Sequence, residues 1–308
     1  MKILVAGSTG LVGSAILDKF KKDGHNVVGI NSKVVDLLDR EATFSYLKDL
    51  KPDVIVDAAA KVGGIGANNK YPVEFLSENL RIQNNLMDAA HEAKVERFIF
   101  LGSSCIYPKN AQQPIKEEYL LTGPLEETNS AYAIAKIAGI EAIKSFRRQY
   151  GHKWISLMPT NMYGPGDNFD QETGHVLPAL INKFVTAKES GIPSVTLWGT
   201  GSPKREFLFS SDLADAVSIA LEKYDDDLHL NVGTGEDLTI KELADLISRE
   251  VGYIGEIIWD HSKPDGTPRK VLDVSRMKNL GWKPKVELKV GIRKTIEFFK
   301  NVKGMVVA

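Results

Sequence analysis

The chain has 308 residues, 43% of them hydrophobic, and its 39 basic and 40 acidic residues give a formal net charge of -1. This length suits one large α/β domain or two smaller ones with a sizeable core. The balanced charge excludes bulk attraction to nucleic acid or to an anionic membrane, so a ligand must be recognised locally. A single cysteine excludes an internal disulfide, and the N-terminal residues do not resemble a signal peptide. We therefore expect a cytoplasmic protein with no nucleic-acid partner, no membrane span and no metal site.

Short apolar runs alternate with amphipathic stretches through the first half of the chain. The expected strands and helices, in chain order, cover residues 3–6, 11–22, 26–30, 40–50, 54–57, 72–93 and 97–101. This βαβ alternation predicts an α/β fold, a Rossmann-type doubly wound parallel sheet with helices on both faces. A further helix, from Tyr132 to Tyr150, is expected to lead into a strand at 154–158.

Beyond Pro159 the pattern loosens, and glycines and prolines separate shorter elements. We predict an NADP-binding Rossmann domain over residues 1–161 and a smaller α/β substrate-binding domain formed mainly by residues 162–308. The chain is expected to return to the first domain near 206–233 and 271–283. No low-complexity linker separates the two parts, so they should pack closely.

A glycine-rich turn follows the first strand and opens the first helix, where a phosphate-binding turn is expected. Its glycines allow close backbone approach, while the helix N-terminus offers free N–H groups and a positive dipole end to a pyrophosphate. The predicted contacts from this turn are Gly7, Ser8, Thr9, Gly10, Leu11, Val12 and Gly13.

The residues after the second strand bear on which dinucleotide binds. Ser32 and Lys33 stand there with no acidic residue that would hold a ribose 2′-hydroxyl, so NADP is favoured over NAD. The alternative is that Lys33 is merely solvated. Asp36 and Leu37 are a plausible adenine-side contact, although an ordinary surface loop would look the same.

A Tyr-x-x-x-Lys pattern suggests proton transfer to a carbonyl. Tyr132 and Lys136 are four residues apart on a predicted helix and so share one face. A phenol has a pKa of about 10, which a nearby ammonium lowers. With Ser103 at the end of the fourth strand, the order of motifs resembles the extended short-chain dehydrogenase/reductase superfamily. The resemblance implies that Ser103 hydrogen-bonds the reacting carbonyl, that Tyr132 donates the proton, and that Lys136 tunes Tyr132 and binds the nicotinamide ribose.

The only cysteine, Cys105, lies two residues beyond Ser103. A lone cysteine is usually a small buried hydrophobe. Beside a carbonyl site, its thiolate could instead accept a proton from the carbon next to a ketone. Such a base needs a counterpart acid on the other face of a sugar, and His175 is the candidate. The alternative is that His175 only begins a helix.

Longer motifs resemble the GDP-L-fucose synthase family. They lie at 62–65, 101–108, 131–136, 159–169, 175, 198–199, 205–207 and 263–266. The family consists of 3,5-epimerase/4-reductases that use NADPH to convert GDP-4-keto-6-deoxy-D-mannose to GDP-L-fucose. The resemblance implies that Cys105 and His175 are the epimerisation base and acid, and that the protein is a homodimer packed through the helices around Tyr132.

The resemblance also implies contacts with the cofactor and with a nucleotide-sugar substrate. Arg205 suits a bidentate diphosphate contact, whereas Lys183, where the family usually carries arginine, keeps the charge without the planar fork. Trp198 either stacks on substrate or belongs to the core. The further cofactor contacts are Leu101, Gly102, Ser103, Ser104, Lys136, Pro159, Thr160, Asn161, Met162 and His175, and the substrate contacts are Lys183, Trp198, Arg205 and Asp265.

Three other functions remain open from the sequence. A GDP-colitose synthase would reduce a further-deoxygenated sugar, and a GDP-mannose 3,5-epimerase-like enzyme would epimerise without net cofactor oxidation. A non-catalytic NADP-sensing protein on the same fold would be expected to have lost the tyrosine or the lysine. This chain retains Ser103, Cys105, Tyr132, Lys136 and His175 together.

Overall fold

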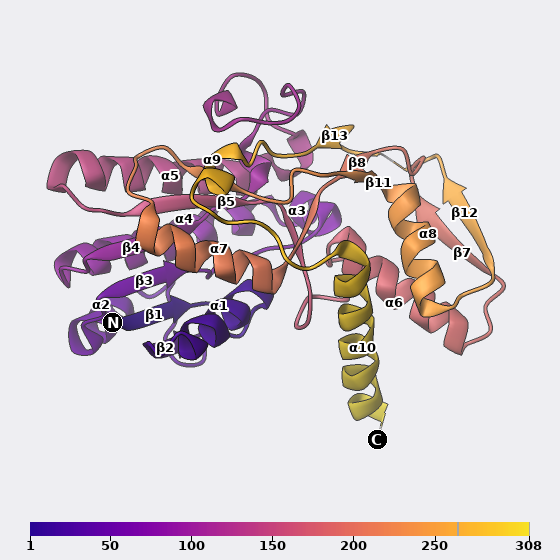
Figure 1. Cartoon of the computed structure of the whole chain (residues 1–308), viewed down its shortest axis with the longest axis horizontal. Helices are drawn as coiled ribbons and strands as arrows, with labels where there is room; N and C mark the ends of the chain where they lie inside the picture. Colours follow the sequence, from indigo (N-terminus) through magenta and orange to yellow (C-terminus); the bar gives the residue numbers. More distant parts are fainter. Residues whose placement is uncertain (264, 308) are drawn as a thin grey trace.

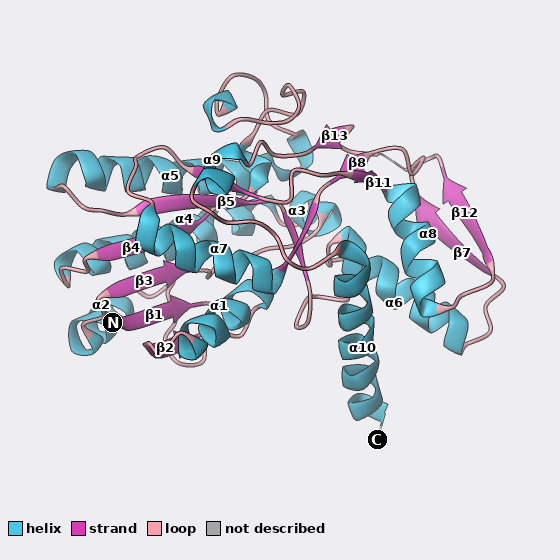
Figure 2. Ribbon diagram, in the orientation of Figure 1, coloured by secondary structure: helices cyan, strands magenta, loops and turns pink. Residues whose placement is uncertain are grey.

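The computed structural model describes residues 1–263 and 265–307, so Pro264 of the motif at 263–266 lies outside the described residues. Figure 1 shows the main sheet with its helices on the left and a second lobe, containing α6, α8, α10, β7 and β12, on the right. Figure 2 shows the same arrangement by element type. In the described part of the chain, no helix is both long and apolar enough to cross a membrane.

The main sheet is parallel throughout, and its strand order is β10-β5-β4-β3-β1-β2. Its strands are β1 (Lys2–Ala6), β2 (Asn26–Ile30), β3 (Val54–Asp57), β4 (Arg97–Leu101), β5 (Ile155–Pro159) and β10 (Leu230–Val232). The direction of winding reverses between β1 and β3, and in open α/β sheets ligands bind outside the strand ends at such a point. The predicted Rossmann-type fold is confirmed.

Helices cover both faces of this sheet because alternate strand residues bury opposite sides. On one face Ile3 and Val5 of β1 pack with α1 (Leu11–Lys22) and α7 (Ser210–Lys223). On the other face Leu4 packs in a cluster with residues of three further helices. These helices are α2 (Arg40–Leu50), α4 (Pro72–Glu92) and α5 (Ser130–Tyr150).

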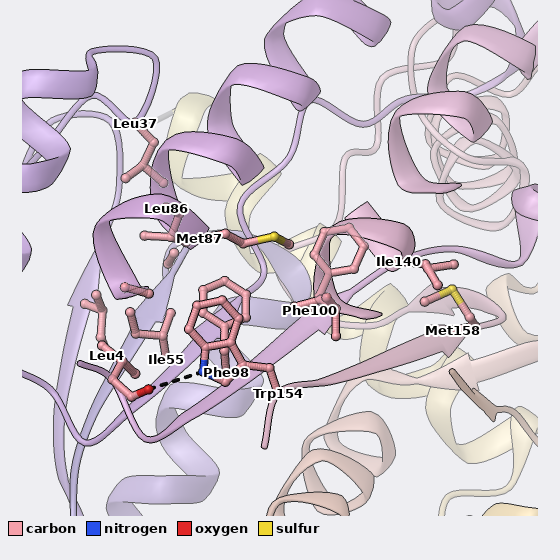
Figure 3. Packing of buried hydrophobic residues seen from close by; sticks show 14 of the residues in the cluster. Leu4, Leu37, Ile55, Leu86, Met87, Phe98, Phe100, Ile140, Trp154 and Met158 are labelled. Carbon is pink, nitrogen blue, oxygen red and sulfur yellow. Dashed lines mark hydrogen bonds between the residues drawn. The ribbon is translucent and has the colours of Figure 1, made fainter. Parts of the chain in front are cut away.

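Figure 3 shows the core beneath α4 and α5. Leu86 and Met87 of α4 lie over Phe98 and the neighbouring strand residues, and all three side chains are fully buried. The Trp154 indole N–H donates a hydrogen bond to the Val95 carbonyl at 3.2 Å, so even the polar edge of this cluster is satisfied. This packing fixes α5, which carries Tyr132 and Lys136, against the sheet.

The second lobe has its own core, in which α6 packs with α8 and α10. Its helices are α6 (Val176–Glu189), α8 (Ile240–Val251) and α10 (Leu288–Val307). Its strands pair as β12 with β7, and as the sheet β11-β8-β13. The bounds of these strands are β7 (Ser194–Trp198), β8 (Lys204–Arg205), β11 (Leu238–Thr239), β12 (Glu256–Asp260) and β13 (Arg269–Lys270).

The chain passes between the lobes more than once. After β5, β6 (Asn161–Tyr163) pairs in parallel with β9 (Phe207–Phe209), in a small sheet separate from the main one. Within the stretch 206–233, β10 then joins the edge of the main sheet beside β5. Two short helices complete the fold, α3 (Ile65–Lys70) and α9 (Ser275–Asn279), of which α9 packs on β10.

Candidate active site

A cleft of about 920 Å³ follows the carboxyl ends of the main-sheet strands and is lined by residues of both lobes. This volume lies within the range of sites that enclose small molecules and cofactors, about 300–1,000 Å³. Every predicted site residue lines the cleft except Ser8 and Lys33. The structure therefore brings together residues that are up to 258 positions apart, from Gly7 to Asp265.

The two exceptions face elsewhere. Ser8 is 9% exposed, and its hydroxyl donates to the Ile30 carbonyl at 3.1 Å, so the side chain fastens the glycine turn to β2. Lys33 is exposed beside the cleft, and its backbone N–H donates to Asn31 Oδ1 at 2.9 Å. Asn31 and Ser32 line the cleft at this point.

The glycine turn is shaped for close backbone approach. Gly7 has φ +73°, and a Cβ placed there would lie 2.6 Å from the Ala58 carbonyl oxygen. A Cβ at Gly13 would lie 2.1 Å from the Gly7 oxygen, so both positions require glycine. The N-cap of α1, Gly10, supplies no side-chain hydrogen bond. The first N–H groups of α1 therefore remain available to an anion.

Lys136 is 3% exposed and lines the cleft together with Tyr132. Its ammonium donates to the Leu101 carbonyl at 2.9 Å and lies 4.7 Å from the Phe100 ring centroid. It is 5.9 Å from the Tyr132 ring centroid, on the same helix face as predicted. Burial lowers the pKa of Lys136 to about 8, and the charge of Asp57 opposes this shift.

Tyr132 behaves differently from the sequence-based expectation. Burial raises the pKa of its phenol, and the nearby Cys105 and Asp57 raise it further. We expected Lys136 to lower this pKa, but its ammonium bonds to a backbone carbonyl and is itself desolvated. The phenol therefore holds its proton at neutral pH.

Asp57, which sequence reasoning missed, lies at the end of β3 and is 1% exposed. Its Oδ1 accepts the Ala59 N–H at 3.1 Å, whereas its Oδ2 is buried with no hydrogen-bond partner in the described structure. Burial raises the pKa of Asp57 to about 6, and the positive charge of Lys136 opposes this. The only indication in the sequence is one acidic residue closing an otherwise apolar strand.

Cys105 lies in a 3₁₀ turn, Ser104–Ile106, directly after β4, and its N–H donates to Ser103 Oγ at 3.2 Å. Its sulfur lies 3.7 Å from Asn129 Nδ2 and 3.7 Å from Lys270 Nζ. Lys270 belongs to the second lobe, where β13 pairs it with Arg205 on β8. Lys270 therefore places a positively charged group next to the sulfur. Asn129 and Lys270 were also missed, because no local pattern connects them to Cys105.

His175 is the N-cap of α6 and its side chain is accessible from the cleft. The Gly64 N–H donates to the Thr173 carbonyl at 2.8 Å, and a Cβ at Gly64 would lie 2.4 Å from the Gly174 oxygen. This close contact between loops holds the segment that ends at His175. The surrounding cleft walls, and secondly the charge of Lys270, lower the pKa of the imidazole.

The predicted substrate contacts form the far end of the cleft. Trp198 is 62% exposed, so it is not a core residue, and Lys263 Nζ lies 5.7 Å from its ring centroid. Lys183 Nζ donates to the Thr196 carbonyl at 3.2 Å. The Asp265 carboxylate accepts the Thr200 N–H at 2.7 Å and the Thr200 hydroxyl at 2.8 Å, which fixes the loop after Trp198.

Comparison with known proteins places this site in a family. Residues 3–233 match the model of the NAD dependent epimerase/dehydratase family. GDP-L-fucose synthase 1 of Arabidopsis thaliana is 51% identical over 303 residues, which cover 98% of this chain and 94% of that protein. GDP-L-fucose synthase of Escherichia coli (strain K12) is 46% identical over 308 residues, covering 97% and 96%. A GDP-L-fucose synthetase from Naegleria fowleri, solved bound to NADP, superposes with a TM-score of 0.90 at 28% identity, covering 98% of this chain and 95% of that one. The chain therefore belongs to the NAD dependent epimerase/dehydratase family, among the GDP-L-fucose synthases.

Proposed function

We propose that the protein converts GDP-4-keto-6-deoxy-D-mannose to GDP-L-fucose, by epimerising C3 and C5 and then reducing the C4 ketone with NADPH. The observation that carries this proposal is the position of the Cys105 thiol. It shares one cleft with Ser103, Tyr132 and Lys136, and His175 lines the same cleft. A ketone reductase alone needs no such thiol and imidazole, whereas an epimerase needs a base and an acid.

The residues present fit a dinucleotide. The glycine turn leaves no room for a Cβ at Gly7 or Gly13, and the uncapped start of α1 offers N–H groups to a pyrophosphate. Asn31 and Ser32 line the cleft directly after β2, where NAD enzymes place an acidic residue, and this supports NADP; the Asp36 carboxylate lines the cleft only four residues further on. When bound, NADPH supplies the hydride for C4.

The chain's own residues perform the proton chemistry. The C4 ketone acidifies the hydrogens at C3 and C5, so the Cys105 thiolate removes each in turn and His175 returns a proton on the opposite face. The hydroxyls of Ser103 and Tyr132 stabilise the negative charge that develops on O4, as preorganised donors do in many enzymes. Tyr132 finally protonates O4, consistent with a phenol that keeps its proton at neutral pH.

The second lobe supplies the groups for the nucleotide diphosphate. Arg205 and Lys183 line the cleft, so two cations are available to the two phosphates. Trp198 offers an exposed aromatic face for stacking on a base.

We also propose that the protein is a cytoplasmic homodimer packed through α4 and α5. On these helices Val73, Ile134 and Tyr150 are 71%, 46% and 50% exposed, so apolar side chains are available there to a second copy of the chain. Light scattering should give twice the chain mass, and Ile134→Glu should reduce it to one chain mass.

The decisive experiment incubates the protein with GDP-4-keto-6-deoxy-D-mannose and NADPH in D₂O and determines the product sugar by NMR. We expect GDP-L-fucose, one NADPH oxidised per product, and deuterium at both C3 and C5. Epimerisation without NADPH oxidation would identify an epimerase only. Reduction without deuterium incorporation would identify a plain reductase, and no turnover would favour a non-catalytic NADP-binding protein.

A further inference from the structure

A second, much smaller cavity adjoins the Cys105 thiol. Its volume is about 10 Å³, close to the minimum that holds one water molecule. Glu126, Asn129 and Lys270 line it together with Cys105, and these four residues also line the main cleft. The thiol region therefore borders two spaces, one large enough for the ligands and one the size of a water.

In the proposed function, the Cys105 thiolate gains a proton at the first epimerisation and must lose it before the second. Each deprotonation of the sugar leaves Cys105 as a neutral thiol, and only the thiolate can act as base at the second carbon. His175 has the opposite need, because it gives up one proton at each carbon. A sugar held between Cys105 and His175 keeps these two groups from exchanging protons directly. The thiol therefore needs a route on its side away from the sugar.

Glu126 provides an acceptor on that route. Its side chain is 12% exposed, and its Oε2 accepts the Thr128 N–H at 3.0 Å and the Thr128 hydroxyl. Its Oε1 lies 3.9 Å from Lys109 Nζ, and the side chain of Lys109 is 38% exposed. Glu126 and Lys109 thus lead from the small cavity to solvent.

Asn129 makes the cavity suitable for an ordered water. Its Nδ2 is 3.7 Å from the Cys105 sulfur, while its Oδ1 is buried and has no hydrogen-bond partner within the described residues. A buried water is stable where it finds two to four polar partners. The Asn129 oxygen, the Glu126 carboxylate and the Lys270 ammonium meet that requirement.

We propose that Glu126, through a water in this cavity, carries the proton of Cys105 to solvent between the two epimerisations. The S–H bond breaks as the thiol protonates the water, and the water passes one of its protons to a Glu126 oxygen. The products are a thiolate and a carboxylic acid, and the acid then releases its proton to bulk water beside Lys109. Lys270 stabilises the restored thiolate.

This role makes Glu126 a relay residue that acts through Cys105 and transfers no proton to or from the sugar itself. In ordinary side chains a thiol is a weaker acid than a carboxyl by about four powers of ten. The protonated carboxyl of Glu126 is therefore a transient carrier that only a small fraction of the molecules hold at any time. This fraction still suffices to carry the proton between the two epimerisations, because enzymes commonly turn over at only about 1–10³ s⁻¹.

The test uses the full chain in excess over GDP-4-keto-6-deoxy-D-mannose in D₂O with NADPH, and follows deuterium at C3 and C5 over time by mass spectrometry. Glu126→Gln should leave the first exchange within about twofold of the wild-type rate and slow the second at least tenfold. Singly deuterated sugar should accumulate. Glu126→Asp should restore double exchange, and Glu127→Gln, an exposed neighbour, is the matched control.

The inference rests on the proposed function, but the two fail in different ways. If the wild type places no deuterium at C3 or C5, both are wrong. If the wild type exchanges both positions and Glu126→Gln does so at equal rates, only the relay is wrong. Parallel loss of both exchanges in Glu126→Gln and Glu126→Asp would assign Glu126 a structural role and also overturn the relay.

Discussion

Replacing Asp57 by asparagine should change how the stability of the protein depends on pH. The pKa of Asp57 is about 6 in the folded protein and 3.8 for an ordinary aspartate. This difference corresponds to about 3 kcal/mol of differential interaction. Because the folded pKa is the higher one, the unfolded chain loses its proton first as the pH rises from 4 to 6. The free energy of unfolding of the wild type therefore decreases over that window, and the full decrease remains at higher pH.

The asparagine variant lacks this titration while keeping the shape of the side chain. The free energy of unfolding of Asp57→Asn, minus that of the wild type, should thus increase by about 2.5 kcal/mol between pH 4 and pH 8. The comparison of two pH values removes any constant cost of burying the amide. Losing the anion near Lys136 should also lower the pKa of that ammonium below about 8.

Urea unfolding followed by tryptophan fluorescence measures this difference at each pH. Asp49→Asn, at an exposed position of α2, is the matched control and should differ from the wild type by no more than about 0.5 kcal/mol at any pH. A stability difference for Asp57→Asn that stays constant to within about 0.5 kcal/mol from pH 4 to pH 8 would refute the reasoning.

Three further predictions concern activity. Cys105→Ser should lower deuterium incorporation at C3 and C5 at least about 100-fold while NADPH affinity, measured by fluorescence titration, stays unchanged; equal incorporation would exclude the thiol as base. Gly64→Ala should slow this exchange more than NADPH binding, because its Cβ would meet the Gly174 oxygen at 2.4 Å and shift His175; a normal exchange rate would contradict that positioning. Reduction rates should fall as the pH rises through about 8, where Lys136 loses its charge, and Lys136→Arg should remove that fall in a pH–rate profile. A wild-type rate that stays level to pH 10 would show that the charge of Lys136 is not needed.

The fold could be predicted because its evidence is local. Apolar strands alternate with amphipathic helices, and the expected ranges 26–30, 40–50 and 97–101 coincide with β2, α2 and β4. Helix α5 begins two residues before Tyr132, and β5 ends one residue later than expected, as is common for element ends. The small sheet of β6 and β9 had no such local evidence, because strands of three residues carry almost no pattern.

Site residues that lie in short sequence motifs could be predicted, whereas those brought to the site by tertiary contacts could not. Ser103, Cys105 and Tyr132 lie in recognisable motifs, and the structure places them in one cleft. Lys270 reaches the Cys105 sulfur from 165 positions away, through the pairing of β13 with β8. The direction of the Tyr132 pKa was also missed, because burial, which raises it most, and the nearness of Cys105 and Asp57 are properties of the folded chain.

Lys270 belongs to the second lobe, so the two parts of the proposed chemistry, epimerisation and reduction, draw on different parts of the molecule. Ser103, Tyr132 and Lys136 all stand on β4 and α5 or directly beside them, so the lobe of the six-stranded sheet carries all three residues together. Lys270, the cation beside the Cys105 sulfur, comes from the other lobe and reaches the sulfur only when the two lobes pack together. A change in the angle between the lobes would therefore move Lys270 relative to Cys105 while leaving Ser103, Tyr132 and Lys136 in place with respect to one another.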